Sequence, residues 1–375
     1  MTTDKGGQWW TRSWNVVRGC SPVGAGCDHC WAARMAARFS RDAGQRLNLN
    51  KGERGFRNIP AGPFHGIAEF DVEGNPRWTR RVELVESMLE APLHWRKPQV
   101  IAVSLMGDWC HENLPDEARD RIFAVMALCP QHTFITLTKR WQGQTEYFHR
   151  VIVEDGEDCD TRFRVLEQAR GLRSPHLNSD ERRVLMKQWQ WPLPNVILGA
   201  SAWDQASADE AWRWLSQTPA ARRLLCLEPL LGPVDLRQHL GGPDADDRCL
   251  RCGLEWPDRQ ETLEPHECPP GFGPRPDCVI VGAETGPGAR PCEWGWIRSV
   301  VQQCKAAGVP VWVKALLDDK GRKVPFENWP QGLRLRKRHE VTPGRTGTVR
   351  PRNSRSPAPT PGRPPGCRGP LHDAD

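Results

Sequence analysis

Three cysteines lie close together near the start of the chain, in a pattern that suits metal binding. Cys20, Cys27 and Cys30 are separated by six residues and then by two, within the segment GCSPVGAGCDHCWA. Three thiolates suit a cubane 4Fe–4S cluster, because one iron atom then stays open to a substrate or co-substrate. The glycines and the proline of this segment predict a loop that can wrap around a bulky cofactor.

Zinc and unligated thiols are the alternatives at this first site. A structural zinc site needs four ligands, and His29 is the nearest candidate for the fourth. Its neighbours Asp28 and Cys30 make that geometry cramped. We therefore favour the iron–sulfur cluster and keep zinc as the second hypothesis.

A second set of potential ligands lies far along the chain. Cys249, Cys252, His266 and Cys268 form a CxxC pair, a thirteen-residue gap and an HxC pair. This spacing predicts a small zinc ribbon with a structural role, whose metal supplies its folding energy. Unligated loop cysteines and a second iron–sulfur cluster remain the alternatives.

Polar side chains follow most of the apolar runs described below, at the point where each predicted strand ends. In a parallel α/β barrel the carboxyl ends of the strands meet at one face and carry the functional groups. Cations there can hold a carboxylate or a phosphate, and a carboxylate can bind hydroxyls or act as an acid or base. We predict catalytic roles for Glu228, Glu284 and Lys314, and cofactor contacts for Asp108, Lys139, Arg140 and Ser201. The alternative is that polar residues merely mark the strand ends.

The apolar runs that position these residues are short and continuous rather than alternating. Such runs are typical of parallel strands covered on both faces. They are Val100–Met106, Thr133–Thr138, Val196–Ala200, Leu224–Leu227, Cys278–Val281 and Val311–Val313, preceded by an early strand near Trp14–Val17. Helices are predicted between several of them, over Pro115–Leu128, Ser207–Gln217 with a capping box at its start, and Glu293–Ala307. About seven βα units result, which favours an α/β fold with a full or partial TIM-like parallel barrel.

Three segments are expected to be additions to a barrel domain that spans residues 1–333. Residues 151–191 are charged and partly helical, which suggests a lid. Residues 241–276 hold the predicted zinc ribbon. Residues 334–375 are rich in Arg, Pro, Ser and Gly without periodicity, which predicts a disordered basic tail.

Composition limits the classes to which the 375-residue chain can belong. The N-terminal segment MTTDKGGQWW lacks the apolar core of a signal peptide, and no apolar run reaches membrane-spanning length. We therefore expect a cytoplasmic protein without a membrane partner. There, fourteen cysteines favour metal ligation over disulfides. The net charge of +6 includes +7 from residues 334–375, so the remainder carries −1 and its charge does not indicate nucleic-acid binding.

Six segments carry a resemblance to a known family, and together they cover most of residues 9–315. They are TRSWNVVRGCSPVGAGCDHCWAARMAAR, PLHWRKPQVIAVSLMGDWCHENLPDE, FAVMALCPQHTFITLTKR, WPLPNVILGASA, TPAARRLLCLEPLLGPVDL and VIVGAETGPGARPCEW. The chain resembles a phage-associated family whose members are named phage gp thirty-seven/sixty-eight family proteins. That family is regarded as radical-SAM-like because of its three-cysteine motif, although the spacing of six and two residues differs from the usual three and two.

The resemblance implies a cluster that binds S-adenosylmethionine (SAM) at its open iron and cleaves it to a 5′-deoxyadenosyl radical. The phage association suggests a nucleic acid, a nucleotide or a related metabolite as substrate, and the chemistry implies an electron donor as partner. Two other functions remain open. One is a zinc-binding barrel hydrolase or transferase, and the other is a non-catalytic nucleic-acid-binding protein that uses the ribbon and the basic tail.

Overall fold

The computed structural model describes residues 7–42, 44–47, 56–59, 61–154, 156–241, 248 and 274–336. The predicted zinc ligands Cys249, Cys252, His266 and Cys268 lie outside the described residues, as do residues 337–375 of the predicted tail. None of the described helices is both long enough and apolar enough to cross a membrane.

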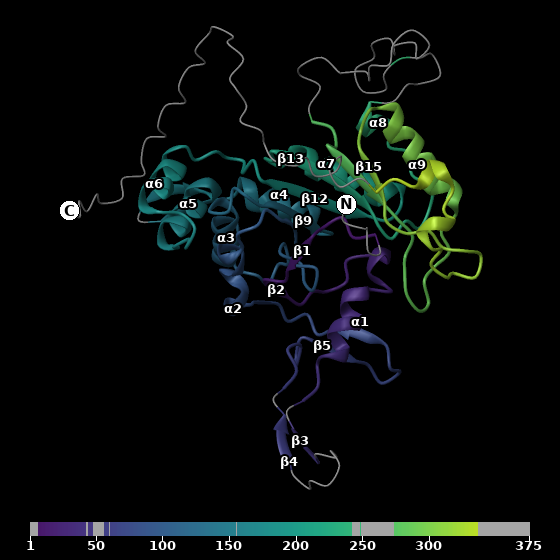
Figure 1. The fold of residues 1–375 in the computed structure, drawn as a ribbon, viewed down its shortest axis with the longest axis horizontal. Helices are drawn as coiled ribbons and strands as arrows, with labels where there is room; N and C mark the ends of the chain where they lie inside the picture. The colour runs from purple at the N-terminus through teal and green to yellow at the C-terminus, as the bar shows by residue number, and fades with distance from the viewer. Residues whose placement is uncertain are drawn as a thin grey trace, which may run out of the picture.

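Seven strands form one parallel sheet that curves into a half-barrel (Figure 1). Their order in the sheet follows their order in the chain, and every neighbouring pair is parallel. They are β1 (Arg12–Trp14), β8 (Val100–Val103), β9 (Thr133–Thr138), β12 (Val196–Ala202), β13 (Arg222–Leu227), β14 (Cys278–Val281) and β15 (Val311–Val313). Among the described strands, β1 and β15 are not paired with each other, so the barrel is partial.

The two faces of the sheet bury different sets of residues, which explains the continuous apolar runs. The outer face packs against helices and contributes Val103, Phe134, Leu198, Leu225, Val281 and Val313 to the main core. The inner face contributes Ala102, Ile135, Ile197, Cys226, Ile280 and Trp312 to a smaller core that is closed by Trp9. Since side chains alternate between the faces, the residues just beyond each strand can be assigned to a face by counting.

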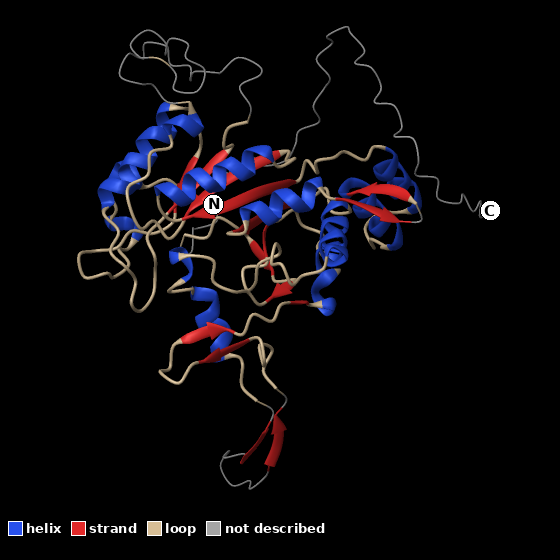
Figure 2. Ribbon diagram, turned by 180° about the vertical axis from the view of Figure 1, so that it is seen from behind, coloured by secondary structure: helices blue, strands red, loops and turns tan. Residues whose placement is uncertain are grey.

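The connecting helices lie mainly on the outer face (Figure 2). They are α3 (Asp116–Ala127), α4 (Trp141–His149), α7 (Gln205–Gln217), α8 (Arg237–Leu240) and α9 (Trp294–Ala306). Helix α7 begins with a capping box formed by Asp204 and Ser207, one turn earlier than the sequence predicted. Helix α9 ends before Gly308, whose φ of 66° suits glycine.

A smaller unit follows β1 and extends away from the sheet (Figure 1). Helix α1 (Trp31–Arg38) packs against the hairpin of β5 (Ala68–Phe70) and β6 (Pro76–Trp78). The rest of this part of the chain contains β2 (Val17–Arg18), β3 (Gly44–Leu47), β4 (Phe56–Ile59), β7 (Glu83–Leu84), α2 (Glu86–Leu89) and the 3-10 helices Ala25–Cys27 and Ala91–His94. The small core beneath α1 includes Ala36, Phe64 and Trp78, and Cys20 and Cys30 pack against it.

The segment predicted to be a lid folds beside α3. It contains β10 (Val151–Glu154), β11 (Glu157–Asp160), α5 (Thr161–Gly171) and α6 (Ser179–Lys187). Arg164 on α5 forms a buried ion pair with Asp120 on α3, at 2.9 Å. The segment joins the end of α4 to the start of β12, so it connects to the amino ends of the strands; its role as a lid stays a prediction.

The packed chain continues three residues beyond the predicted start of the tail. Two 3-10 helices, Phe326–Asn328 and Gln331–Leu333, precede this point. The backbone N–H of Val313 donates to the carbonyl of Leu335 at 2.9 Å. Arg336 lies 4.5 Å from the ring of Phe326 and 4.3 Å from that of Trp329. The prediction that Arg334–Arg336 belong to a disordered tail is therefore wrong.

The mixed α/β class, the seven parallel strands and the partial barrel agree with the sequence prediction. Thr133–Thr138, Cys278–Val281 and Val311–Val313 have the predicted bounds. The predicted first strand near Trp14–Val17 is wrong in its bounds. The chain leaves the sheet after Trp14, and Val17 and Arg18 pair instead with β7 in an antiparallel ladder.

Candidate functional site

The cysteine loop begins where two glycines bring two backbone segments together. Gly19 forms a bridge with Gly107, which follows β8, and its N–H donates to the carbonyl of Met106 at 3.1 Å. Gly19 has a φ of 95°, and a Cβ there would lie 2.0 Å from the carbonyl oxygen of Arg81. Only glycine fits this conformation and this approach, so the loop starts at the carboxyl end of the sheet.

The three cysteines are all half-buried, and the structure brings them to one region. Cys20 and Cys30 interact electrostatically with each other, and Lys139 interacts with both Cys27 and Cys30. Cys30 is also the N-cap of α1, where its sulfur accepts a hydrogen bond from the N–H of Ala33 at 3.5 Å.

The described residues contain no group of three or more His, Cys, Asp or Glu side chains that converges on a single metal ion. A cubane cluster is wider than one ion, because each cysteine binds a different iron atom. Three half-buried thiols are the donors that such a cluster takes, and the cluster itself stays a prediction.

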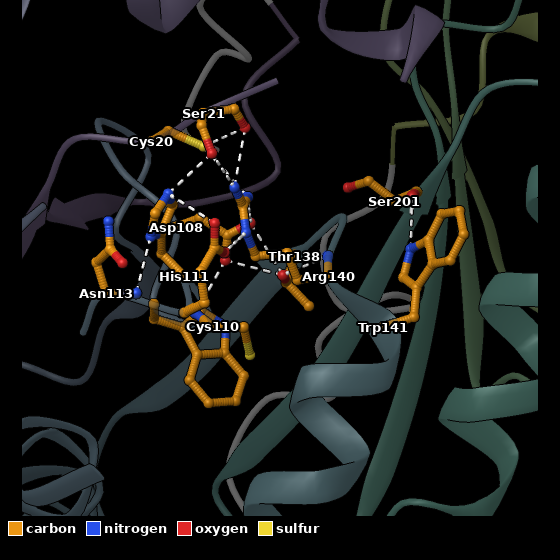
Figure 3. Close-up of polar contacts among 12 residues, drawn as sticks. Cys20, Ser21, Asp108, Cys110, His111, Asn113, Thr138, Arg140, Trp141 and Ser201 are labelled. Carbon is orange, nitrogen blue, oxygen red and sulfur yellow. Dashed lines mark hydrogen bonds and ion pairs between the residues drawn. The ribbon is translucent and has the colours of Figure 1, made fainter. Parts of the chain in front are cut away.

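Arg140 ties the start of the cysteine loop to the end of β9 (Figure 3). Its guanidinium donates to the sulfur of Cys20 at 3.5 Å and to the carbonyl and hydroxyl of Ser21 at 3.0 and 2.7 Å. It also pairs with Asp108 at 3.2 Å and with Glu112 at 2.8 Å. Arg140 and Asp108 are each only 8% exposed, so this is a buried ion pair.

Asp108 is held in place by groups from two other segments. The hydroxyl of Thr138 donates to its carboxylate at 2.8 Å, and the N–H of Cys110 donates to the same oxygen at 2.9 Å. The carboxylate therefore has three kinds of hydrogen-bond donor, which offset the cost of burying its charge. Asp108 holds Arg140 through this buried ion pair, and its predicted contact with a cofactor stays a prediction.

His111 supports Ser21 from below the loop (Figure 3). The ring Nδ1 accepts the N–H of Asn113 at 3.1 Å, so the neutral ring carries its proton on Nε2 and donates it to the Ser21 hydroxyl at 2.9 Å. Burial lowers the pKa of His111, and the nearby Arg140 lowers it further, which keeps the ring neutral. Ser21 then accepts from both His111 and Arg140, and its own hydroxyl proton remains available for another acceptor.

Burial controls the protonation of Cys20. It raises the pKa of this thiol to about 12, and the charge of Asp108 adds to the effect, although Arg140 acts in the opposite direction. In the metal-free chain Cys20 is therefore a thiol at neutral pH. Metal binding has to displace its proton, as it does at other thiolate sites.

Glu284 and Arg290 hold the other end of the cysteine loop. Arg290 donates to the two carboxylate oxygens of Glu284 at 2.7 and 3.0 Å, and to the carbonyl of Ala25 at 2.8 Å. The Nδ1 of His29 lies 3.0 Å from Glu284. Burial tends to raise the pKa of Glu284, but the hydrogen bonds from Arg290 outweigh it and lower the pKa. Glu284 therefore contacts Arg290 and His29, and its predicted catalytic role stays a prediction.

Two aromatic rings hold the middle of the loop. A Cβ at Gly24 or Gly26 would lie 2.6 or 2.5 Å from the ring of Trp203, so the loop backbone packs directly on this indole. Trp203 in turn stacks near Trp141, with ring centroids 5.7 Å apart. Trp141 donates its indole N–H to the carbonyl of Ser201 at 2.9 Å (Figure 3). Trp203 follows β12 directly, so this strand also positions the loop.

Four predicted residues belong to the inner face of the half-barrel at its carboxyl end. Counting by twos from Leu137, Ile197, Cys226 and Trp312 leads to Lys139, Ser201, Glu228 and Lys314. Lys314 Nζ donates to the Glu228 carboxylate, and the Ser201 side chain hydrogen-bonds Cys226. These four residues, together with Cys226, are called the inner mouth below.

Lys139 is electrostatically coupled both to the cysteines and to the inner mouth. Burial tends to lower the pKa of its ammonium group. Cys27, Cys30, Cys226 and Glu228 outweigh that effect and raise the pKa. Lys139 therefore remains a cation at neutral pH, and it connects the cysteine loop to the inner mouth.

The structure thus brings Cys20, Cys27, Cys30 and the seven predicted strand-end residues to one end of the sheet. Sequence reasoning missed Ser21, Thr138, Trp203 and Arg290 as parts of the site. Arg290 follows the turn GPGA directly after Glu284, and this position was the signal that could have identified it. No local sequence pattern pointed to Trp203, because its role depends on contact with Gly26, which lies 177 residues earlier in the chain.

A family model described as Protein of unknown function (DUF5131) matches residues 6–339. The chain belongs to the DUF5131 family. The match covers every strand of the half-barrel and the whole cysteine loop, so this site lies within the region that defines a DUF5131 protein. Comparison with curated proteins gave no significant match, and comparison with solved structures gave none either.

Proposed function

We propose that this chain is a radical-SAM-like iron–sulfur enzyme whose cluster is held by Cys20, Cys27 and Cys30. The observation that carries the proposal is the placement of three half-buried cysteines at the carboxyl end of a parallel half-barrel, with Lys139 facing them. Substrates of α/β barrels bind at this end. The phage-family resemblance and the three-cysteine motif supply the SAM part of the proposal.

A bound 4Fe–4S cluster would supply the electron that cleaves SAM. The protein's own residues orient and enclose the cluster loop. Arg140 and Asp108 hold Cys20 and Ser21 from one side, and Glu284 and Arg290 hold residues 25–29 from the other. Trp203 covers the loop backbone and limits the access of water. The inner mouth lies next to the loop and is where we place the substrate, which we propose is a nucleic acid, a nucleotide or a related metabolite.

Anaerobic reconstitution tests the proposal. The purified protein is treated with iron and sulfide, and iron and sulfide content and the electron paramagnetic resonance of the reduced sample are measured. Substitution Cys27→Ser should abolish cluster formation. The matched control Cys129→Ser should not, because Cys129 is buried in the main core away from the loop. Reduced protein with SAM should release 5′-deoxyadenosine, and a loaded cluster that leaves SAM intact would contradict the SAM part of the proposal.

One contact favours zinc as a second candidate. The Nδ1 of His29 lies 3.0 Å from the Glu284 carboxylate, and histidines that bind a metal through Nε2 commonly donate their other ring N–H to a carboxylate. With Cys27 and Cys30, His29 would form a zinc site for a hydrolase or transferase. His29→Ala separates the two candidates: zinc content falls if zinc is bound here, whereas iron content is retained if the three cysteines hold a cluster.

A further inference from the structure

The inner mouth carries one positive charge more than its own carboxylate neutralises. Its charged groups are the ammonium groups of Lys139 and Lys314 and the carboxylate of Glu228.

Lys314 and Glu228 form an ion pair and are only 29% and 17% exposed. Lys139 has no hydrogen bond or ion pair within the part of the chain that the structure describes. Glu228 and the sulfur atoms of Cys27, Cys30 and Cys226 lie near it, but Glu228 is already paired with Lys314, so the N–H donors of Lys139 are free to bind an incoming anion.

The other cations near the loop already have partners. Every nitrogen of the Arg140 guanidinium donates, to Glu112, Asp108, Cys20 or Ser21. Arg290 is bound to Glu284, Asp28 and the carbonyl of Ala25. Both arginines therefore maintain the architecture, and Lys139 retains all three of its N–H donors for a ligand.

We propose that Lys139 is the anion-binding residue of the site and takes a carboxylate or phosphate group of the ligand that enters the inner mouth. Only the origin of this anionic group depends on the proposed function; the assignment of Lys139 as its binding residue does not. One source is the carboxylate of SAM, and the other is a phosphate of the substrate. The nearby Glu228 leaves a net charge of +1 at the mouth, which favours a group with a single negative charge over one with more.

Binding to the cluster-free protein tests this directly, because an iron atom of the cluster cannot then hold the ligand in place of Lys139. Isothermal titration calorimetry is carried out with two probes, S-adenosylhomocysteine for the carboxylate and inorganic phosphate for the phosphate. At least one should bind the unaltered chain. Lys139→Gln should weaken that binding at least about tenfold, which is typical for the loss of a charged hydrogen bond. The probe that shows the loss identifies the source of the anion.

Three further variants show whether a change in binding is due to the charge of Lys139. Lys97→Gln is the matched control, since Lys97 is exposed and precedes β8 at the opposite end of the sheet, and it should bind as the unaltered chain does. Glu228→Gln removes the competing negative charge and should tighten binding several-fold. Lys139→Arg keeps the charge and should retain most of the affinity.

The inference is overturned if neither probe binds, if Lys139→Gln binds as the unaltered chain does, or if Glu228→Gln weakens binding. It is also overturned if Lys139→Gln lowers the melting temperature well below that of Lys97→Gln, because Lys139 would then be a structural partner. Cluster formation is measured separately. A chain that binds no iron but shows binding dependent on Lys139 would contradict the proposed function and leave this inference standing.

Discussion

At the residue scale, two arginines hold the cysteine loop, whereas the neighbouring Lys139 forms no hydrogen bond or ion pair with the described residues. Arg140 and Arg290 each contact the loop and a buried carboxylate, Asp108 or Glu284. Lys139 faces the thiols without such a carboxylate of its own. Residues of the same charge at the carboxyl end of the sheet therefore differ in the partners that they contact.

Loss of Arg140 should destabilise the fold, because Asp108 would remain buried without its counter-ion. Arg140→Met is expected to cost about 3 kcal/mol of unfolding free energy. The control is Arg121→Met, which removes the ion pair with Glu86, a residue that is 64% exposed, and should cost about 1 kcal/mol or less. Urea denaturation of both variants measures the difference. Equal costs would show that the Arg140–Asp108 pair is not effectively buried.

Glu284 should make stability depend on pH in acid. Despite its burial, hydrogen bonds from Arg290 hold the pKa of Glu284 in the folded chain below its ordinary value of 4.5. The carboxylate therefore stabilises the fold at pH values above that unfolded value, and this contribution is lost as the pH falls through the folded pKa. Glu284→Gln cannot titrate, so its unfolding free energy should decrease less than that of the unaltered chain on acidification below about pH 4.5.

Several other carboxylates also have lowered pKa values, including Asp71, Glu86 and Asp318. Total acid sensitivity therefore cannot be assigned to Glu284 alone. Only the difference between the two proteins isolates it. Parallel curves of unfolding free energy against pH would show that Arg290 does not hold Glu284 in its ionised form.

At the element scale, the cysteine loop contacts the carboxyl ends of three strands of the sheet. Its start is tied to β9 through Arg140, and its middle lies on Trp203 after β12. Its end is tied through Arg290 to Glu284, which follows β14. Three parallel strands therefore fix one loop, and each does so through a residue just beyond its carboxyl end.

The close contact between Gly26 and Trp203 makes glycine necessary at this position. In Gly26→Ala the new Cβ would lie 2.5 Å from the indole, so the loop or the ring has to move. We expect less iron after reconstitution and a lower melting temperature. Gly295→Ala is the control, since a Cβ at that exposed position of α9 meets nothing within 4 Å and alanine favours a helix. Normal iron binding in Gly26→Ala would show that the loop adapts without losing its cysteine geometry.

Much of this arrangement was predictable from local patterns, and the rest depends on distant contacts. Continuous apolar runs predicted the buried parallel strands, and counting by twos from those runs places Lys139, Ser201, Glu228 and Lys314 on one face. The early strand was misplaced because Val16 and Val17 are as apolar as Trp14, although the chain has already turned out of the sheet there. The contacts of Glu284 with Arg290 and His29 could not be predicted, because no local pattern encodes their approach.

At the scale of the whole molecule, segments before the first strand and after the last strand of the half-barrel pack against it. Trp9 covers the inner face near the start of the described chain, and Arg336 stacks on Phe326 and Trp329 at its end. Arg336 also donates to the carbonyl of Lys314 at 2.6 Å. The end of the packed chain therefore supports the strand that carries an inner-mouth residue.

Truncation should locate this boundary. A chain that ends at Arg336 should melt close to the temperature of the full chain, because residues 337–375 have too little apolar content to form a core. A chain that ends at Leu333 loses the hydrogen bond from Val313 to Leu335 and the stacking of Arg336, and should melt several degrees lower. Equal melting temperatures for the two truncations would contradict a stabilising role for residues 334–336.

The attachment of the cysteine loop at both ends also has a consequence for its amide protons. Surface loops usually open locally at little free-energy cost, so their amides exchange rapidly with solvent deuterium. This loop cannot open without breaking the hydrogen bonds of Cys20 and Ser21 with Arg140 at one end, or those of Ala25 with Arg290 and His29 with Glu284 at the other. Its hydrogen-bonded amides, such as that of Cys27, whose N–H donates to the carbonyl of Gly24, should therefore exchange together with those at the ends of β9 and β14. The loop amides would therefore exchange as slowly as those of the sheet, even though the loop sequence is that of a glycine-rich surface turn.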